Sequence, residues 1–349
     1  MKTGTTVSSQ RALRAILPTP PAAIAHKKVP GLELATDTFL AKVSFVGVVG
    51  RDGSGAPSVT ARMGEGGAPK IAGERTLMLS DSPAARLGGE LESALGPGGV
   101  GLVCLIPGVP ETLRINGDVQ PCDEEGWAKI DVSEVYFHCP KAFLRAQLWA
   151  PRESLAPLPG SAAGVRERLD SADVSFLEGA SFALLGTHDG DGGFDLSPRG
   201  DPGGLLRILD DRTLFLPDRP GNRIADSLRN ILATGEAALL ALVPGRGQSL
   251  RVQARAEIVT DPALLEPAAE KGRAPKLGVR LDVRTVSFED GPALGQSAMW
   301  DPGRHTDPKS LPSLGELLLQ QLDPNGRGRR VKTFFLDRMM KRDAAKNLY

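Results

Sequence analysis

The chain contains the stretch Arg212-Thr-Leu-Phe-Leu-Pro-Asp-Arg-Pro220, and a near copy, Arg75-Thr-Leu-Met-Leu-Ser-Asp-Ser-Pro83, lies 137 residues earlier. At this offset residues 39–119 align with residues 176–256 without a gap, and 27 of the 81 aligned positions are identical. Further on the offset becomes 151, because the second copy carries 14 extra residues around Pro262 to Pro275. A period of this size indicates a duplicated domain rather than a solenoid of short repeats.

Each copy is predicted to be mostly strand, with one or two helices. In the first copy, apolar runs bounded by turn residues predict strands at 44–49, 56–61, 76–79, 101–106, 112–119 and 130–137. The Asp52-Gly53 pair is typical of a hairpin turn, and Pro83 suits the first turn of a helix near 83–95. Several short strands around a single helix favour a β-barrel over a parallel α/β sheet. The predicted fold is therefore mainly β, as two tandem barrels with flanking helices.

The same reasoning predicts the domain boundaries. We expect a first barrel over residues 1–151, a linker over 152–165 that is rich in Pro, Ala and Gly, and a second barrel over 166–320. Residues 321–349 lie beyond the duplicated unit. From Gly326 to Tyr349 this tail has eight Lys or Arg against two Asp, and apolar residues at 331, 335 and 339 suit an amphipathic helix.

Composition excludes several classes of protein. The 349 residues include 42 basic and 42 acidic side chains, so the chain lacks the basic field that nucleic-acid or membrane coating requires. No apolar run approaches the length needed to span a bilayer, and the N-terminal segment makes a poor secretory signal. Three cysteines without a Cys-x-x-Cys pair argue against disulfides and a cysteine zinc site. We expect a cytoplasmic protein without a metal centre.

The sequence lacks the common catalytic motifs, but the second copy has an anion-binding pattern. It has no phosphate-binding P-loop, dinucleotide fingerprint, zinc-protease helix or nucleophile elbow, and its four histidines are scattered. The pattern comprises Asp195-Leu-Ser-Pro-Arg-Gly-Asp201 and Asp218-Arg-Pro-Gly-Asn-Arg223, followed by a predicted helix. A helix N-terminus with nearby arginines suits a phosphate, although Arg–Asp pairs that simply hold a loop would look the same.

These segments of the second copy resemble the pyridoxamine 5′-phosphate oxidase-like family of FMN-binding split barrels. The first copy matches the family through a later segment, Val135-Tyr-Phe-His-Cys-Pro-Lys-Ala-Phe-Leu-Arg-Ala-Gln-Leu-Trp149. The resemblance implies six-stranded split barrels, FMN at a dimer interface and electron-transfer chemistry. It assigns the FMN phosphate to Arg199 and Arg223. The neighbouring cofactor-binding residues that it suggests are Ser197, Arg219, Asn222, Ser227 and Asn230.

The two copies depart from the family pattern in opposite places. The first copy has Ser-Asp-Ser-Pro-Ala-Ala-Arg86 in place of the arginine-rich motif, and the second lacks His138, Lys141 and Arg145 at its equivalent positions 289, 292 and 296. Sites in a homodimer of this family borrow residues from both protomers. We therefore predict a pseudo-dimer within one chain that has one complete composite site. The mirror site has lost both halves and should be weak or empty.

The sequence leaves the reaction open. The leading hypothesis is an FMN-dependent oxidoreductase that acts on a small-molecule substrate, with NADH or NADPH as a candidate reductant. His138 is a candidate proton donor, and Lys141 or Arg145 is a candidate cation beside the flavin. Alternatives are a deazaflavin in place of FMN, a haem with His138 or His188 as axial ligand, and a flavin-binding protein without turnover. The oxidase activity of the family's namesake is not expected, because its C-terminal substrate motif is not found. Whether two chains associate further is also left open.

Overall fold

The computed structural model describes residues 6–20, 28–32, 34–63, 68–80, 86–87, 95–120, 126–138, 140–158, 164–202, 204–291, 294, 299–322, 333, 336–340, 342 and 348. The strands of the first half are β1 Phe45–Arg51, β2 Pro57–Met63, β3 Lys70–Gly73, β4 Thr76–Ser80, β5 Gly98–Leu105, β6 Thr112–Gln120 and β7 Trp127–His138. Those of the second half are β8 Val165–Arg166, β9 Phe182–His188, β10 Phe194–Gly200, β11 Arg207–Ile208, β12 Thr213–Pro217, β13 Glu236–Leu242, β14 Gln248–Val259 and β15 Gly278–Asp290. The helices are α1 Gln10–Ile16, α3 Leu34–Leu40, α4 Lys141–Ala146, α5 Ser171–Gly179, α6 Asp226–Thr234, α7 Pro262–Leu265 and α9 Leu314–Leu322, with short 3-10 turns η3 Glu266–Ala268, η4 Pro302–Arg304 and η5 Pro308–Ser310.

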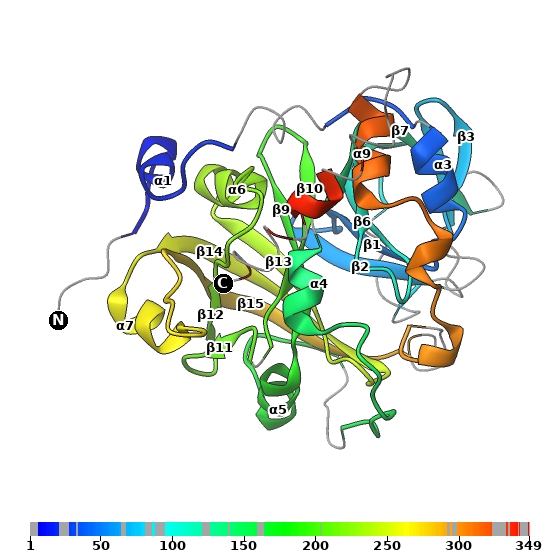
Figure 1. The fold of residues 1–349 in the computed structure, drawn as a ribbon. Helices are drawn as coiled ribbons and strands as arrows, with labels where there is room; N and C mark the ends of the chain where they lie inside the picture. The colour runs from blue at the N-terminus through cyan, green and yellow to red at the C-terminus, as the bar shows by residue number, and fades with distance from the viewer. Residues whose placement is uncertain are drawn as a thin grey trace.

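Two antiparallel sheets with the same strand order form the body of the molecule, which confirms the predicted mainly β fold. The first sheet runs β2-β1-β5-β6-β7-β4-β3, and the second runs β10-β9-β13-β14-β15-β12-β11. Even the irregularities repeat, because a bulge follows Asn116 in β6 and Gln253, its equivalent, in β14. Figure 1 shows the two halves side by side, with α4 between them.

The halves face each other across a pseudo-two-fold axis. Trp149 and its equivalent Trp300 lie with ring centroids 6.4 Å apart, and their indole N–H groups donate to the equivalent carbonyls of Val109 and Arg246. Packing of a residue against its own counterpart is expected only at a symmetry axis. The two tryptophans are therefore packing residues.

The contacts on this axis are asymmetric where space is tight. A Cβ on Gly47 would overlap Leu184, which is the residue equivalent to Gly47 in the second copy. Two positions further on, a Cβ on Gly186 would overlap its counterpart Val49. Each pair therefore has one glycine and one larger side chain that occupies the space beside it. The glycine belongs to the first half in one pair and to the second half in the other. Two identical copies could not build either contact.

Three apolar clusters stabilise this arrangement. One fills each barrel, and the third lies between the barrels. The third cluster includes Phe45 and Phe143 from the first half and Phe182 and Leu240 from the second, all at most 2% exposed. Burial of this extent is typical of a core rather than a loose domain contact.

Each end of the chain packs on the barrel formed by the opposite half. Leu13 of α1 is fully buried in the core of the second barrel, and Val7 N–H donates to Ile258 of β14. Conversely, Leu314 and Leu317 of α9 belong to the core of the first barrel. In Figure 1 the dark-blue α1 lies beside the second barrel and the orange α9 beside the first.

Parts of the predicted tail and helix lie outside the described residues. The tail is described at 333, 336–340, 342 and 348, where Met340 packs against the core of the first barrel and Asp337 accepts a hydrogen bond from Gly315 N–H. The helix expected near 83–95 is described only at 86, 87 and 95. Within the described segments, no helix is both long and apolar enough to cross a membrane.

Candidate functional site

A cavity of about 460 Å³ lies between the two barrels. The first half contributes Arg114 of β6, His138 at the end of β7 and residues of α4, and the second contributes β10 and the segment 217–228. This volume lies within the range that small-molecule and cofactor pockets occupy. The cavity therefore combines the two segments that the sequence comparison singled out in different copies.

Two arginine–aspartate pairs form one wall. Arg199, on β10, lies 2.9 Å from Asp218, which follows β12, and Arg219 lies 2.6 Å from Asp201. Burial raises the pKa of both aspartates, although the adjacent arginines oppose the shift. β10 and β12 belong to the same sheet but do not pair directly, and the two ion pairs hold Arg199 and Arg219 in place before any ligand arrives. We call Arg199, Arg219 and Arg223 the arginine wall.

The loop that leads into α6 has an unusual backbone. Arg223 and Ala225 have φ values of 62° and 65°, in the left-handed region that residues other than glycine rarely adopt. Arg14 of α1 donates 3.0 Å hydrogen bonds to the carbonyls of Arg223 and Ile224. Asn222 also accepts a hydrogen bond from Ile224 N–H. Local strain held by neighbouring contacts is common at binding sites.

A buried ion pair joins the halves at the inner end of the cavity. Arg114 of β6 pairs with Asp195 of β10, and Ser227 of α6 donates a 3.0 Å hydrogen bond to the same carboxylate. The guanidinium also lies 5.0 Å from the ring centre of Tyr136. Burial raises the pKa of the Tyr136 phenol well above its usual value, despite the opposing charge of Arg114. At neutral pH this end therefore holds a neutral phenol beside a charged pair.

A second link between the halves lies beside the first. Lys28 lies 2.9 Å from Glu134 of β7 and 2.9 Å from Asp226 at the start of α6. Burial alone would raise the pKa of Asp226, but Lys28 and Arg114 outweigh it and hold the pKa below its usual value. Asp226 is therefore a carboxylate under ordinary conditions.

A further part of the lining comes from the segment after β7 in the first half. His138, Lys141 and Arg145 all line the cavity, and the side chains of Lys141 and Arg145 are buried. Arg145 donates hydrogen bonds to the carbonyl of Pro220, beside the arginine wall, and to that of Leu348 near the C-terminus. Arg145 therefore connects the first half to the loop of the second.

Most predicted site residues line this cavity. Those that do are His138, Lys141, Arg145, Ser197, Arg199, Arg219, Asn222, Arg223 and Ser227. Asn230 is not among the lining residues, since its amide donates to Thr187 within the second barrel. His188, one of the proposed haem ligands, lies 3.1 Å from Glu236 and stacks on Phe194 instead.

Sequence reasoning missed several lining residues. Arg114 and Asp195 lie within segments that were identified, but nothing in the sequence showed that they would meet across the two copies. Arg273 and Lys276 line the cavity from the end of the 14-residue insertion, which the sequence comparison treated only as a gap. Residues 262–275 carry two basic and two acidic side chains, so the net charge of the insertion gave no signal.

The positions equivalent to the inner ion pair have a different partner. Arg251, the counterpart of Arg114, lies 3.0 Å from Glu289, which stands where the first half has His138. The counterpart of Asp195 is Ser58, whose hydroxyl accepts a 3.4 Å hydrogen bond from Arg251. Burial raises the pKa of Glu289 to about 7, although Arg251 opposes the shift. Arg114 therefore pairs with a carboxylate from the opposite half, whereas Arg251 pairs with a carboxylate from its own half.

The cavity favours an anion that accepts hydrogen bonds. Among its described lining residues, eight are Arg or Lys and three are Asp. Within the described part of the chain, the buried Nε of Arg199 and Nδ2 of Asn222 have no hydrogen-bond partner. Buried donors without partners are costly, so a ligand that accepts from them stabilises the site. A phosphate group meets this requirement, and the arginine wall therefore fits a phosphorylated cofactor.

Together, the paired antiparallel barrels and the cationic cavity between them define a split-barrel protein. The family model for pyridoxamine 5′-phosphate oxidase matches residues 169–290. The second half of the chain therefore matches the pyridoxamine 5′-phosphate oxidase-like split-barrel family, as the resemblance indicated. No curated protein sequence matches the chain.

Several solved structures are similar to one half of the chain. HupZ of group A Streptococcus is 19% identical, with a TM-score of 0.29, and the match covers 34% of this chain and 94% of HupZ. An F420 reductase is 22% identical, with a TM-score of 0.25, covering 33% of this chain and 94% of the reductase. PhzG of Burkholderia lata, solved with tetrahydrophenazine-1-carboxylic acid, is 18% identical, with a TM-score of 0.24, covering 35% and 76%.

Proposed function

We propose that the cavity binds one FMN per chain and that the protein is an FMN-dependent oxidoreductase acting on a small molecule. The observation that carries this proposal is a cavity lined both by the arginine wall of the second half and by His138, Lys141 and Arg145 of the first. A bound flavin supplies reversible hydride and electron transfer. The protein supplies the binding site and its electrostatics.

The residues have separate tasks in this proposal. Arg199 and Arg223 neutralise the phosphate, and the unpaired Nε of Arg199 and Nδ2 of Asn222 donate to its oxygens. Lys141 and Arg145, both nearly buried, place positive charge in the cavity from the first half. Such charge stabilises an anionic reduced cofactor. His138 is the lining residue whose ordinary pKa suits proton transfer near neutrality.

The first experiment is the visible absorption spectrum of the purified protein, with released cofactor quantified per chain. A two-band flavin spectrum at about one FMN per chain supports the proposal. Two flavins per chain bound with equal affinity contradict the single composite site. A colourless protein that takes up no added FMN overturns the flavin proposal. Steady-state oxidation of NADH or NADPH in the presence of FMN then distinguishes an enzyme from a flavin carrier.

A matched pair of variants tests the location of the site. Arg223→Ala removes an exposed cation from the arginine wall, whereas Arg86→Ala changes its equivalent in the first copy. We expect Arg223→Ala to weaken FMN binding about tenfold, because a charge-assisted hydrogen bond is worth roughly 1.5–3 kcal/mol when buried and less when exposed. Arg86→Ala should leave the affinity within about twofold of the wild-type value. Equal effects of the two variants contradict the assignment.

Haem is a second candidate, because His138 lines the cavity whereas His188 does not. A sharp Soret band in the same spectrum identifies this case, and its loss in His138→Ala with retention in His188→Ala assigns the ligand. A deazaflavin cofactor carries a phosphate that requires the same kind of binding site as the phosphate of FMN. The absorption spectrum and mass of the released cofactor separate these two.

A further inference from the structure

The 14 residues that interrupt the repeat fold into an ordered element beside the cavity. After β14 the chain forms α7 and η3 and then a tight turn, in which Glu270 and Arg273 make a β-bridge. Lys271 and Gly272, at the tip, have φ values of 50° and 73°. Left-handed backbone at two successive positions reverses the chain sharply. In the first copy only six residues, 121–126, separate β6 from β7.

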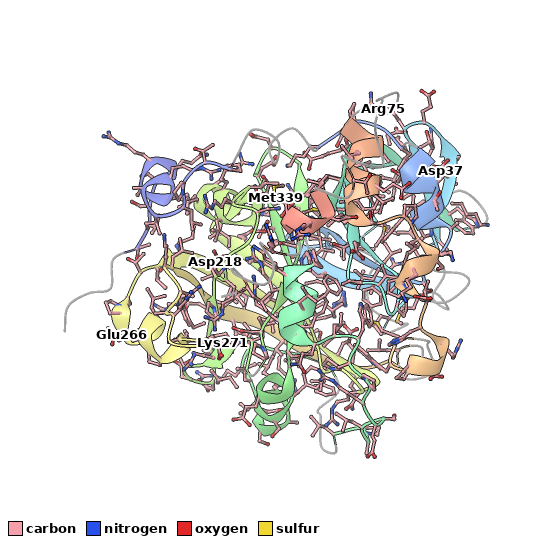
Figure 2. All side chains as sticks on the ribbon, viewed as in Figure 1. Asp37, Arg75, Asp218, Glu266, Lys271 and Met339 are labelled. Carbon is pink, nitrogen blue, oxygen red and sulfur yellow. The ribbon has the colours of Figure 1, made fainter. Side chains whose placement is uncertain are left out.

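This insertion is anchored by its own apolar cluster. Leu265 and Ala268 pack with Phe215 of β12 and Val259 of β14, and all four are buried. Arg207 of β11 also donates a hydrogen bond to the carbonyl of Pro267. In Figure 2 Glu266 and Lys271 of the insertion lie in the same half of the molecule as Asp218, away from Asp37 and Arg75. The element is therefore placed by packing and not only by its chain ends.

The end of the insertion returns the chain to the arginine wall. Residues 273–276 line the cavity, and Asp218 N–H donates a 3.1 Å hydrogen bond to the carbonyl of the next residue, Leu277. Arg273 and Lys276 are exposed, so they lie where the cavity opens to solvent. Asp218 in turn pairs with Arg199. Two solvent-facing cations are therefore held next to the proposed phosphate position.

These cations exceed what one phosphate requires. The arginine wall already presents three guanidinium groups, and Lys141 and Arg145 add two cations from the first half. Glu270 of the insertion lies near enough to Asp201 to raise the pKa of that carboxyl, so it offsets part of this positive charge. A strongly positive cavity mouth attracts a further anion and binds it in competition with salt.

We propose that the insertion forms a second anion subsite, in which Arg273 and Lys276 bind an additional phosphate or carboxylate group at the mouth of the cavity. This inference rests on the proposed function only in that FMN marks the first anion position. The additional group belongs either to the distal part of an extended cofactor or to a separate anionic substrate. The chemistry that the subsite recognises is the same in both cases.

The test uses the full chain and a pair of double variants with equal charge change. Arg273→Ala/Lys276→Ala removes the subsite, and Arg280→Ala/Lys309→Ala removes two exposed cations that do not line the cavity. FMN, FAD and inorganic pyrophosphate are the probes. Calorimetry measures FMN and FAD binding to the flavin-free chain, and pyrophosphate binding to the FMN-saturated chain, at low and high salt.

We expect the subsite variant to bind FMN within about twofold of wild type. It should lose about fivefold or more in affinity for one of the larger anionic probes, as two exposed charge contacts predict. Loss confined to FAD indicates that the subsite holds the cofactor's distal part, and loss confined to pyrophosphate indicates a separate substrate. If the two double variants bind all three probes alike, the subsite is refuted. If wild type binds no flavin, the proposed function fails, and pyrophosphate binding to the flavin-free chain still tests the subsite.

Discussion

Arg114 and Arg251 occupy equivalent positions in the two halves but have different electrostatic partners. Arg114 pairs with Asp195 across the interface, whereas Arg251 pairs with Glu289 of its own half and reaches only neutral groups across it. The cavity described here lies on the side of Arg114. Both copies therefore keep the arginine, but its acidic partner is Asp195 on one side of the interface and Glu289 on the other. As a result, the two sides of the interface present different charges to a ligand.

The largest expected effect comes from removal of Arg114. Arg114→Met leaves the buried Asp195 with only the Ser227 hydroxyl, and an unpaired buried charge costs about 3–5 kcal/mol of unfolding free energy. Denaturant unfolding monitored by tryptophan fluorescence measures the change. Arg114→Met/Asp195→Ser, which introduces the serine found at the equivalent position 58, should recover most of the loss. No recovery would falsify the pairing as the cause.

The mirror side is expected to respond to pH. The pKa of Glu289 is about 7 in the folded protein, above its ordinary value of 4.5. The folded state therefore holds a proton that the unfolded state releases, so stability falls as pH rises from about 4.5 to 7, by up to about 3 kcal/mol. Unfolding midpoints across this range should show the fall in wild type and a smaller one in Glu289→Gln. Equal slopes in both proteins contradict this origin.

The axis contacts give a swap experiment. Gly47→Leu should cost about 1–3 kcal/mol, because the added side chain overlaps Leu184. Leu184→Gly should cost at least as much by leaving a cavity. The exchanged double variant, Gly47→Leu/Leu184→Gly, refills the space from the other half and should be more stable than the sum of the single changes predicts. Strict additivity of the two free energies would show that these residues do not share one space.

The smallest effect concerns the backbone at the arginine wall. Ala225 adopts a left-handed conformation that glycine accepts without strain. Ala225→Gly should therefore stabilise the protein by about 0.5–1 kcal/mol, in contrast to the loss expected from the same change inside a helix. The melting temperature measures this change. A lower melting temperature indicates that the alanine methyl group contributes more by packing than its backbone costs.

The repeat made the fold predictable from the sequence. Asp-Gly turns, Pro-Gly turns and apolar runs recur at a constant offset, so each strand of one copy supports its equivalent in the other. Both sheets show this correspondence, from the hairpin at Asp52 to the positive φ of Gly108 and Gly245. Local signals of this kind depend on neighbouring residues and are therefore readable along the chain.

The site was only partly predictable. The arginine wall and the His138 segment were found because each differs visibly between the copies. The meeting of Arg114 with Asp195 depends on how two sheets pack, and no spacing within either segment encodes it. Asn230 shows that a match to the motif does not guarantee a place in the site. Its side chain donates a hydrogen bond to Thr187, and it does not line the cavity. The role of Arg273 and Lys276 depends on the path of an insertion that has no equivalent for comparison.

The exchange of terminal helices has a consequence for folding during synthesis. The first barrel includes Leu314 and Leu317 in its core, although its strands are complete by residue 138. The second barrel includes Leu13, which leaves the ribosome long before any of its strands. The first barrel must therefore wait for α9, whereas the segment that the second barrel needs is already present when its strands are made. Folding domain by domain from the N-terminus, the usual route for long chains, can give only an incomplete first barrel until α9 has been translated.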